Sequence, residues 1–94
     1  MNLIKYMKDG CVPCNLITNL LDEKGVKYIE INALKDSKEK IEERYGSLGV
    51  IIEEIKNNLS GVPVLVLLND NKEEVGRVSG FNPDEIDSLL RKLN

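Results

Sequence analysis

Both cysteines of the chain lie in one short segment, Gly10-Cys11-Val12-Pro13-Cys14, with two residues between them. Two thiols at this spacing could form a redox couple, supply half of a metal site, act as a structural disulfide, or be buried as small inert residues. A closed zinc site needs about four ligands, and the chain has two cysteines and no histidine. The sequence therefore predicts no metal site within one chain, and leaves a metal shared by two chains as an alternative.

The apolar pattern predicts the elements that position these cysteines. A short apolar strand is expected at 3–7, followed by a helix from Pro13 whose apolar residues recur at helical spacing and end before Gly25. The cysteines then lie between a strand and a helix N-terminus. The remaining predicted elements are a strand at 26–31, helical structure within 35–59, a strand at 62–68, a turn at 69–72, a strand at 73–79, and a helix from Pro83 with Asn82 as its N-cap.

The segment 35–59 carries an apolar stripe that two glycines interrupt. Asp36 or Ser37 is expected to begin the helical structure, and Glu39 follows Asp36 at the spacing of a capping box. The stripe predicts either one kinked helix or two helices.

The predicted order is β-α-β-α-β-β-α within a single domain spanning 1–94. Its first half is a βαβ unit, whose two strands should be parallel, and its second half adds a hairpin and a helix. We therefore expect an α/β fold with a mixed four-stranded sheet flanked by helices. Cys11 should lie at the carboxyl end of a parallel strand, where ligands and chemistry collect in α/β sheets.

A helix N-terminus suits thiolate chemistry, because its unpaired N–H groups stabilise an anion. Cysteines of C-x-x-C motifs in that position ionise at about pH 3.5 to 7.5, well below a free thiol. We expect Cys11, at the tip, to be the nucleophile, and Cys14, one turn further and more buried, to resolve the mixed disulfide. The charges of Lys8 and Asp9 should roughly cancel at this helix start.

Composition excludes several other functions. The formal net charge is −3, and no Lys/Arg block provides the basic surface that nucleic acid or an anionic membrane would need. The four aromatic residues are too few for a base-stacking surface. No signal-peptide pattern or membrane-length apolar run is present, so we expect a cytoplasmic monomer, in a compartment where thiols are kept reduced.

Several motifs together carry a resemblance that covers nearly the whole chain. A strand leads to Gly-Cys-x-x-Cys and a helix, then Gly61-Val62-Pro63 opens an apolar strand, and a hairpin ends in Gly80 before the last helix. This pattern resembles the thioredoxin/glutaredoxin superfamily in its short, glutaredoxin-like form. Within it, "CVPC" and "SGFNPDEI" (79–86) are similar to the glutaredoxin-like redoxins that reduce class Ib ribonucleotide reductase.

The resemblance implies a thioredoxin-like fold and a dithiol–disulfide oxidoreductase that reduces protein disulfides, with ribonucleotide reductase as a candidate substrate. It implies a redox-active Cys11–Cys14 disulfide without a bound cofactor, and recharging by thioredoxin reductase. It also implies a cis bond before Pro63, beside the cysteines, which leaves the backbone of Val62 free to pair with a substrate strand.

An apolar rim for a docking partner is expected around the sulfurs. Val12, Pro13 and Val62 would supply it, together with Gly80 and Phe81, although Phe81 could instead pack in the core.

The sequence also departs from glutaredoxins proper at the positions that hold glutathione. Gly61 replaces the usual Thr, Ser79-Gly80 replaces a paired glycine, and Asp84 falls in the first turn of the last helix. These differences favour thioredoxin reductase over glutathione as the electron donor. A glutathione-dependent glutaredoxin is the alternative, and a thioredoxin-fold binding module without turnover is the alternative from another class.

Overall fold

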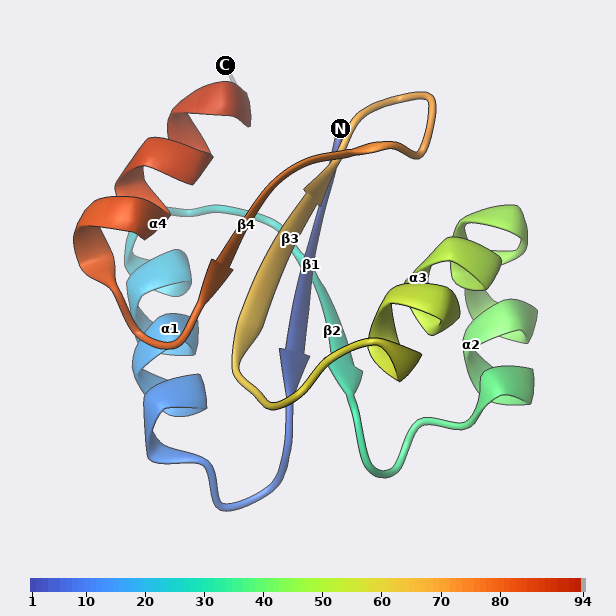
Figure 1. Cartoon of the computed structure of the whole chain (residues 1–94). Helices are drawn as coiled ribbons and strands as arrows, with labels where there is room; N and C mark the ends of the chain where they lie inside the picture. The colour runs from blue at the N-terminus through green and yellow to red at the C-terminus, as the bar shows by residue number, and fades with distance from the viewer. Residues whose placement is uncertain (94) are drawn as a thin grey trace.

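A mixed four-stranded sheet forms the centre of the computed structural model, which describes residues 1–93 (Figure 1). The strand order is β2-β1-β3-β4, with β1 parallel to β2 and antiparallel to β3, and with β4 antiparallel to β3. The elements are β1 (Asn2–Met7), α1 (Val12–Glu23), β2 (Ile29–Asn32), α2 (Lys38–Tyr45), α3 (Ser47–Asn57), β3 (Val64–Leu68), β4 (Glu74–Ser79), α4 (Pro83–Leu90) and a 3-10 turn, η1 (Arg91–Leu93).

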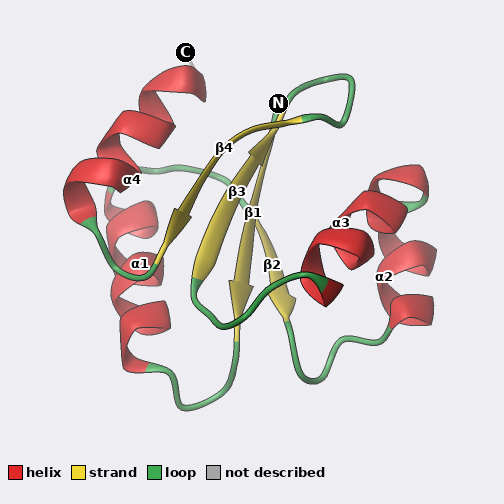
Figure 2. Cartoon of the chain, viewed as in Figure 1, coloured by secondary structure: helices red, strands yellow, loops and turns green. Residues whose placement is uncertain are grey.

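Helices cover both faces of the sheet (Figure 2). Alternate residues of β1 point to opposite faces, so that Leu3 packs in the cluster with α1 and α4, whereas Ile4 and Tyr6 pack in the cluster with α2 and α3. The central strand β3 is buried along its whole length, as expected for a strand covered on both sides. This architecture confirms the predicted thioredoxin-like α/β fold.

The segment 35–59 forms two helices rather than one. The break is at Gly46, whose φ of 60° and ψ of −131° are readily accessible only to glycine. The helices then approach closely, since a Cβ on Gly49 would lie 2.6 Å from the carbonyl oxygen of Ile41. The predicted capping box is wrong, because Ser37 is the N-cap and accepts from the N–H of Lys40. The Asp36 carboxylate instead accepts from the N–H of Asn32.

The other predicted elements are present, and three of the four strands are shorter than or offset from the predicted ranges, whereas β1 begins one residue earlier, at Asn2. β2 begins at Ile29 rather than at 26, and β3 begins at Val64 rather than at 62, after a proline that has no N–H to donate. The predicted cap of α4 is confirmed, because the Asn82 side chain accepts from the N–H of Glu85. No helix within residues 1–93 combines the length and apolar character required to cross a membrane.

Candidate functional site

A disulfide joins Cys11 and Cys14 at the beginning of α1, with an S–S distance of 2.16 Å and Cα atoms 5.2 Å apart. Cys11 is the N-cap residue of the helix, and its Sγ accepts a hydrogen bond from the N–H of Cys14 at 3.2 Å. A first-turn N–H therefore points at this sulfur, which is an arrangement that stabilises a thiolate after reduction.

The sequence predicts an exposed Cys11 and a more buried Cys14, but both cysteines are buried in the structure. Cys11 is 5% exposed and Cys14 is fully buried, so Cys14 is the more buried residue, whereas Cys11 is far less exposed than expected of a helix tip. Val12 and Pro13, between them, are both exposed. The exposed surface between the two cysteines is therefore formed by these two side chains.

Asp9, one of the two charges expected to act on the helix start, has a partner that the sequence did not predict. The Asp9 carboxylate forms an ion pair with Lys35 at 2.5 Å and accepts a hydrogen bond from Asn32 Nδ2 at 3.3 Å. The same contact with Asp9 raises the pKa of Lys35. Because a cation already compensates Asp9, its effect on a Cys11 thiolate is weaker than that of an isolated carboxylate. The sequence did not indicate Lys35, which comes from the loop after β2.

The loop before β3 reaches the same edge of the sheet as the cysteines. Tyr6 of β1 pairs with Val64, and Val64 pairs with Ser79, so the end of β1 and the start of β3 lie side by side. The Val62–Pro63 peptide bond is cis. Within residues 1–93, no hydrogen bond engages the backbone N–H or C=O of Val62, whereas the Pro63 carbonyl accepts from Gly80.

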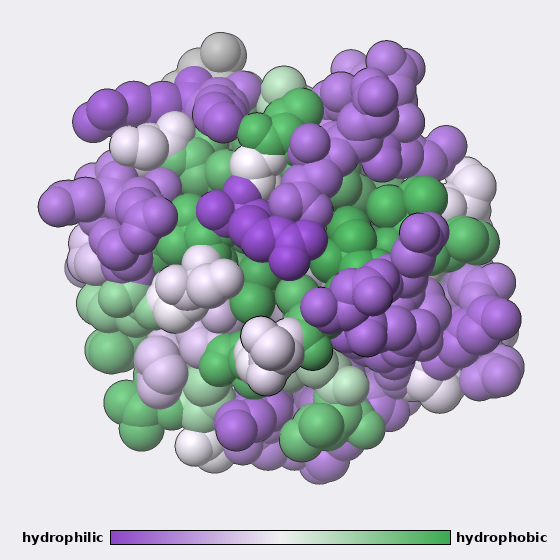
Figure 3. Space-filling model, in the orientation of Figure 1, coloured by the Kyte–Doolittle hydropathy of each residue, from purple (hydrophilic) through white to green (hydrophobic). Residues whose placement is uncertain are grey.

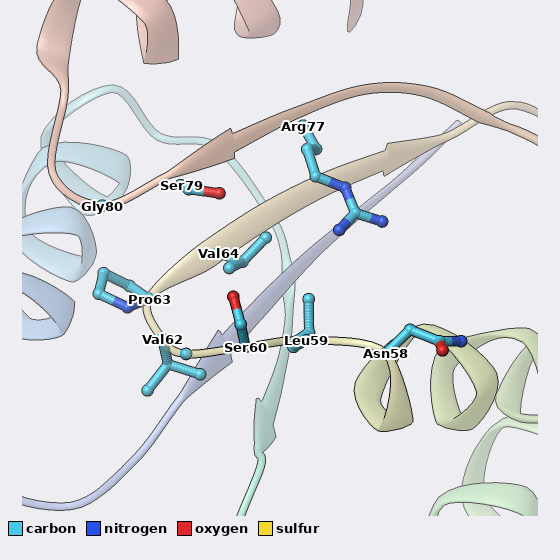
Figure 4. A pocket seen from close by; sticks show the side chains of 10 residues that line it. Asn58, Leu59, Ser60, Val62, Pro63, Val64, Arg77, Ser79 and Gly80 are labelled. Atoms are coloured by element: carbon cyan, nitrogen blue, oxygen red, sulfur yellow. The ribbon is translucent and has the colours of Figure 1, made fainter.

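A cleft of about 240 Å³ lies beside this loop (Figure 4). Val62, Pro63 and Gly80 share it, so the structure brings together three of the predicted site residues. Arg77 extends from β4 towards the cleft, and the sequence analysis did not identify it. Its guanidinium forms a two-point contact with the Glu74 carboxylate, at 2.8 and 2.6 Å. This contact raises the pKa of Arg77 and compensates its charge.

Phe81 follows Gly80 and does not line this cleft. Its side chain is exposed, so the alternative of a core position is wrong. Apolar surface is visible along the lower edge of the molecule, while polar side chains cover much of α2 and α3 (Figure 3). Exposed apolar side chains among the described residues include Val12, Leu34 and Phe81.

A buried lysine is a third feature of this region that sequence reasoning missed. Lys5 lies in β1 and is 1% exposed. The signal was present, because Lys5 interrupts the apolar run "LIKYM" six residues before Cys11.

Within residues 1–93 no group of three or more His, Cys, Asp or Glu side chains could hold a metal ion.

Comparisons with known proteins agree with this geometry. The sequence matches the glutaredoxin family over residues 3–72. It is 32% identical over 93 residues, covering 99% of each chain, to the SPbeta prophage-derived thioredoxin-like protein YosR of Bacillus subtilis (strain 168).

Solved structures show the same fold at lower sequence identity. Thioredoxin f from spinach chloroplast gives a TM-score of 0.69 at 16% identity, over 96% of this chain and 72% of that one. The glutaredoxin-like NrdH-redoxin from Escherichia coli gives 0.56 at 21% identity, over 95% of both chains. The cysteine pair of this chain therefore lies on a fold shared by thioredoxins and glutaredoxin-like proteins.

Proposed function

The chain belongs to the glutaredoxin family, and from that premise we propose that it is a thiol–disulfide oxidoreductase that reduces disulfides in other proteins. The observation that carries the proposal is the Cys11–Cys14 disulfide at the start of α1, with Cys11 Sγ accepting from the first-turn N–H of Cys14. A disulfide of this kind alternates between oxidised and reduced forms and needs no bound cofactor.

The reaction proceeds in two thiol–disulfide exchanges. In the reduced protein the Cys11 thiolate attacks one sulfur of the substrate disulfide, forms a mixed disulfide, and releases the other substrate sulfur as a thiolate. Cys14 then loses its proton and attacks Cys11 Sγ, which releases the second substrate sulfur. Two electrons pass to the substrate, and the Cys11–Cys14 disulfide is regenerated.

The proposed docking surface surrounds this centre. The free backbone of Val62 would pair with an extended segment of the substrate, next to Pro63. Val12 and Pro13 on one side, with Gly80 at the cleft and Phe81 after it in the chain, would form the rim against which the partner packs. We propose that the protein acts as a monomer in the cytoplasm, because a dithiol donor requires a compartment that keeps thiols reduced.

We propose that thioredoxin reductase recharges the protein more effectively than glutathione does. Glutathione carries two carboxylates and an amine, each of which needs a partner in the site. Gly61 has no side chain to offer, and Arg77 is already engaged by Glu74. The likeness to NrdH-redoxin, whose activity profile is thioredoxin-like, supports the same donor. The resemblance of "CVPC" and "SGFNPDEI" to redoxins that reduce class Ib ribonucleotide reductase makes that reductase the first protein substrate to try.

One observation favours glutathione as the second candidate donor. The cleft beside Val62 and Pro63 holds a guanidinium and the hydroxyls of Ser60 and Ser79, which are groups that could bind a small anionic peptide. Exchange of Glu74 for a ligand carboxylate would make Arg77 available. The two donors are therefore compared directly in the experiment below.

The test measures turnover of insulin disulfides with two electron supplies, NADPH with thioredoxin reductase and NADPH with glutathione and glutathione reductase. We expect faster turnover with thioredoxin reductase. Comparable or faster turnover with millimolar glutathione would assign the protein to the glutathione-dependent glutaredoxins. No turnover with either supply, at an intact Cys11–Cys14 pair, would instead support a binding module.

A further inference from the structure

Lys5 is a buried cation on the sheet face that carries α1. Its neighbours on that face are Leu3 on the same strand and Leu65, its cross-strand partner on β3, and both belong to the apolar cluster. Burying an ammonium costs several kcal/mol unless other groups compensate it. A lysine at this position therefore calls for an explanation beyond packing.

Three contacts hold the ammonium. Lys5 Nζ forms an ion pair with the Glu30 carboxylate at 2.9 Å, and the two residues are register partners on β1 and β2. It also donates to the hydroxyl oxygen of Thr18 on α1. The Tyr28 ring lies on a third side, with its centroid 5.8 Å from Nζ.

The two ends of the ion pair have different surroundings. The Lys5 side chain is 1% exposed, whereas that of Glu30 is 44% exposed. Solvent therefore screens the carboxylate much more than the ammonium. The ammonium is therefore the member of the pair that lies within the protein interior.

The contacts of Lys5 lead to the second cysteine. The hydroxyl of Thr18, which accepts from Lys5, donates to the carbonyl oxygen of Cys14 at 3.3 Å. Cys14 is one helical turn before Thr18 and is fully buried, so its sulfur has little access to solvent for stabilisation of a negative charge.

We propose that Lys5 is a positioning residue for Cys14, which holds the first turn of α1 through Thr18 and supplies the positive charge that favours the Cys14 thiolate. The proposal rests on the proposed function and concerns its second exchange. In that step the Cys14 thiol loses its proton to water, a bond forms between Cys14 Sγ and Cys11 Sγ, and the bond from Cys11 Sγ to the substrate breaks. The substrate sulfur leaves with the electron pair and takes a proton from water.

Other charged and titratable groups around this site belong to several elements. Glu30 faces Lys5 from β2, and Tyr28 precedes that strand, with burial raising the pKa of its phenol. Asp22 lies on α1 and acts electrostatically on Tyr28. Lys8 and Asp9 lie before the helix, where Asp9 is compensated by Lys35. β3 and α4 contribute Leu65 and Ile86, which are apolar.

The test substitutes Lys5→Met, which keeps the length and removes the charge. In a Cys11→Ser background Cys14 is the single thiol, and the ultraviolet absorbance of its thiolate is followed against pH. We expect Lys5→Met to raise the pH of half-ionisation by about one unit, the low end of the effect of a neighbouring opposite charge. Lys5→Arg should keep it close to that of Lys5.

Kinetics of the second exchange give a further readout with both cysteines present. Dithiobis(nitrobenzoate) releases one nitrobenzoate thiolate when Cys11 attacks and a second when Cys14 resolves the mixed disulfide. Lys5→Met should slow the second release about threefold at neutral pH and leave the first nearly unchanged, because a tenfold smaller thiolate fraction is partly offset by the higher nucleophilicity of the more basic thiolate. Thr18→Val should act in the same direction by a smaller factor, and it tests the contact independently if Lys5→Met does not fold.

Lys24→Met is the matched control, because it removes a lysine from a surface ion pair with Asp87 near the other end of α1. It should change neither readout. If Lys5→Met lowers the Tm but changes neither the ionisation of Cys14 nor the rate of the second release, Lys5 has a structural role and the proposal is overturned. If the Tm, the ionisation and the rate are all unchanged, the proposal is overturned as well. Failure of the wild-type protein to reduce insulin would count against the proposed function alone, because the thiolate titration needs no turnover.

Discussion

The two faces of the sheet bury charge in different ways. On the face under α1 and α4, the contacts of Lys5 lead through Thr18 to the helix that carries the cysteines. On the face under α2 and α3, Lys56 pairs with Glu53 at 2.8 Å and donates to the Asp36 carbonyl at 2.8 Å, so it joins α3 to the loop before α2. The fully buried cation, Lys5, thus contacts the helix that carries the cysteines, whereas Lys56, with its side chain 12% exposed, joins α3 to the loop before α2.

Tyr6 supports this division. It alternates with Lys5 along β1 and so points to the α2/α3 face, where its hydroxyl donates to the carbonyl of Ile52 at 2.8 Å. Burial raises the pKa of the phenol well above its ordinary value, so Tyr6 stays neutral. Its contact is with helix backbone, as expected of a group that fixes packing.

The largest expected effect is on the cysteines of the first face. Cys11→Ser should abolish disulfide reduction, because the N-cap sulfur is the one that accepts from the first-turn N–H of Cys14. Cys14→Ser should still attack a substrate but stop at the mixed disulfide, which can be measured by mass spectrometry after incubation with insulin.

Alkylation of the reduced wild-type protein below neutral pH checks the same assignment. Cys11 should be modified first. Preferential modification of Cys14 would reverse the two roles and would remove the basis for linking Lys5 to the resolving step.

An intermediate effect is expected from a lysine-to-methionine substitution on the α2/α3 face of the sheet. Lys56→Met leaves Glu53 with its side chain 11% exposed and without its cation, and it removes the bond to the Asp36 carbonyl. We expect the free energy of unfolding to fall by about 2 kcal/mol, less than for a fully buried pair. Urea unfolding should show this loss, with thiolate ionisation of Cys14 unchanged.

Lys5→Met is to be compared with Lys56→Met. It removes the cation of an ion pair whose remaining carboxylate, Glu30, is well solvated. Its stability should change little, since apolar replacement of a buried charge is often neutral or stabilising. Equal losses of stability in Lys56→Met and Lys5→Met, with no change in thiol chemistry in either, would contradict the division between the faces.

The local sequence was sufficient to predict most elements and the cysteine centre. Patterns within a few residues specify the cap of α4 at Asn82, the helix start at Cys11, and the strand at β3. The order of these elements in turn predicts a mixed sheet with Cys11 at the end of a parallel strand, because crossover rules leave few alternatives.

Contacts between distant segments were beyond what local patterns can predict. Lys35 compensates Asp9 only because the loops after β1 and β2 end at the same edge of the sheet. The apolar run around Lys5 indicates an unusual lysine, but only the strand register identifies Glu30 as its partner. The choice between Asp36 and Ser37 as the cap also depended on a distant partner, the backbone of Asn32.

The smallest expected effect concerns an exposed pair at the edge of the α2/α3 face. Hydrogen bonding to Arg77 lowers the pKa of the Glu74 carboxyl from its ordinary value of 4.5. The unfolded chain therefore binds this proton more readily, so the pair stabilises the fold fully above about pH 4.5, and the contribution disappears as the pH falls further.

Because both side chains are about one third exposed, Glu74→Gln should cost less than about 1 kcal/mol at neutral pH. The difference from wild type should vanish in acid, whereas Glu54→Gln, an exposed carboxylate on α3, should show no such pH dependence. Urea unfolding at neutral and acid pH measures both. A loss that persists in acid would mean that Glu74 stabilises β4 through packing, and that its ion pair with Arg77 contributes nothing measurable.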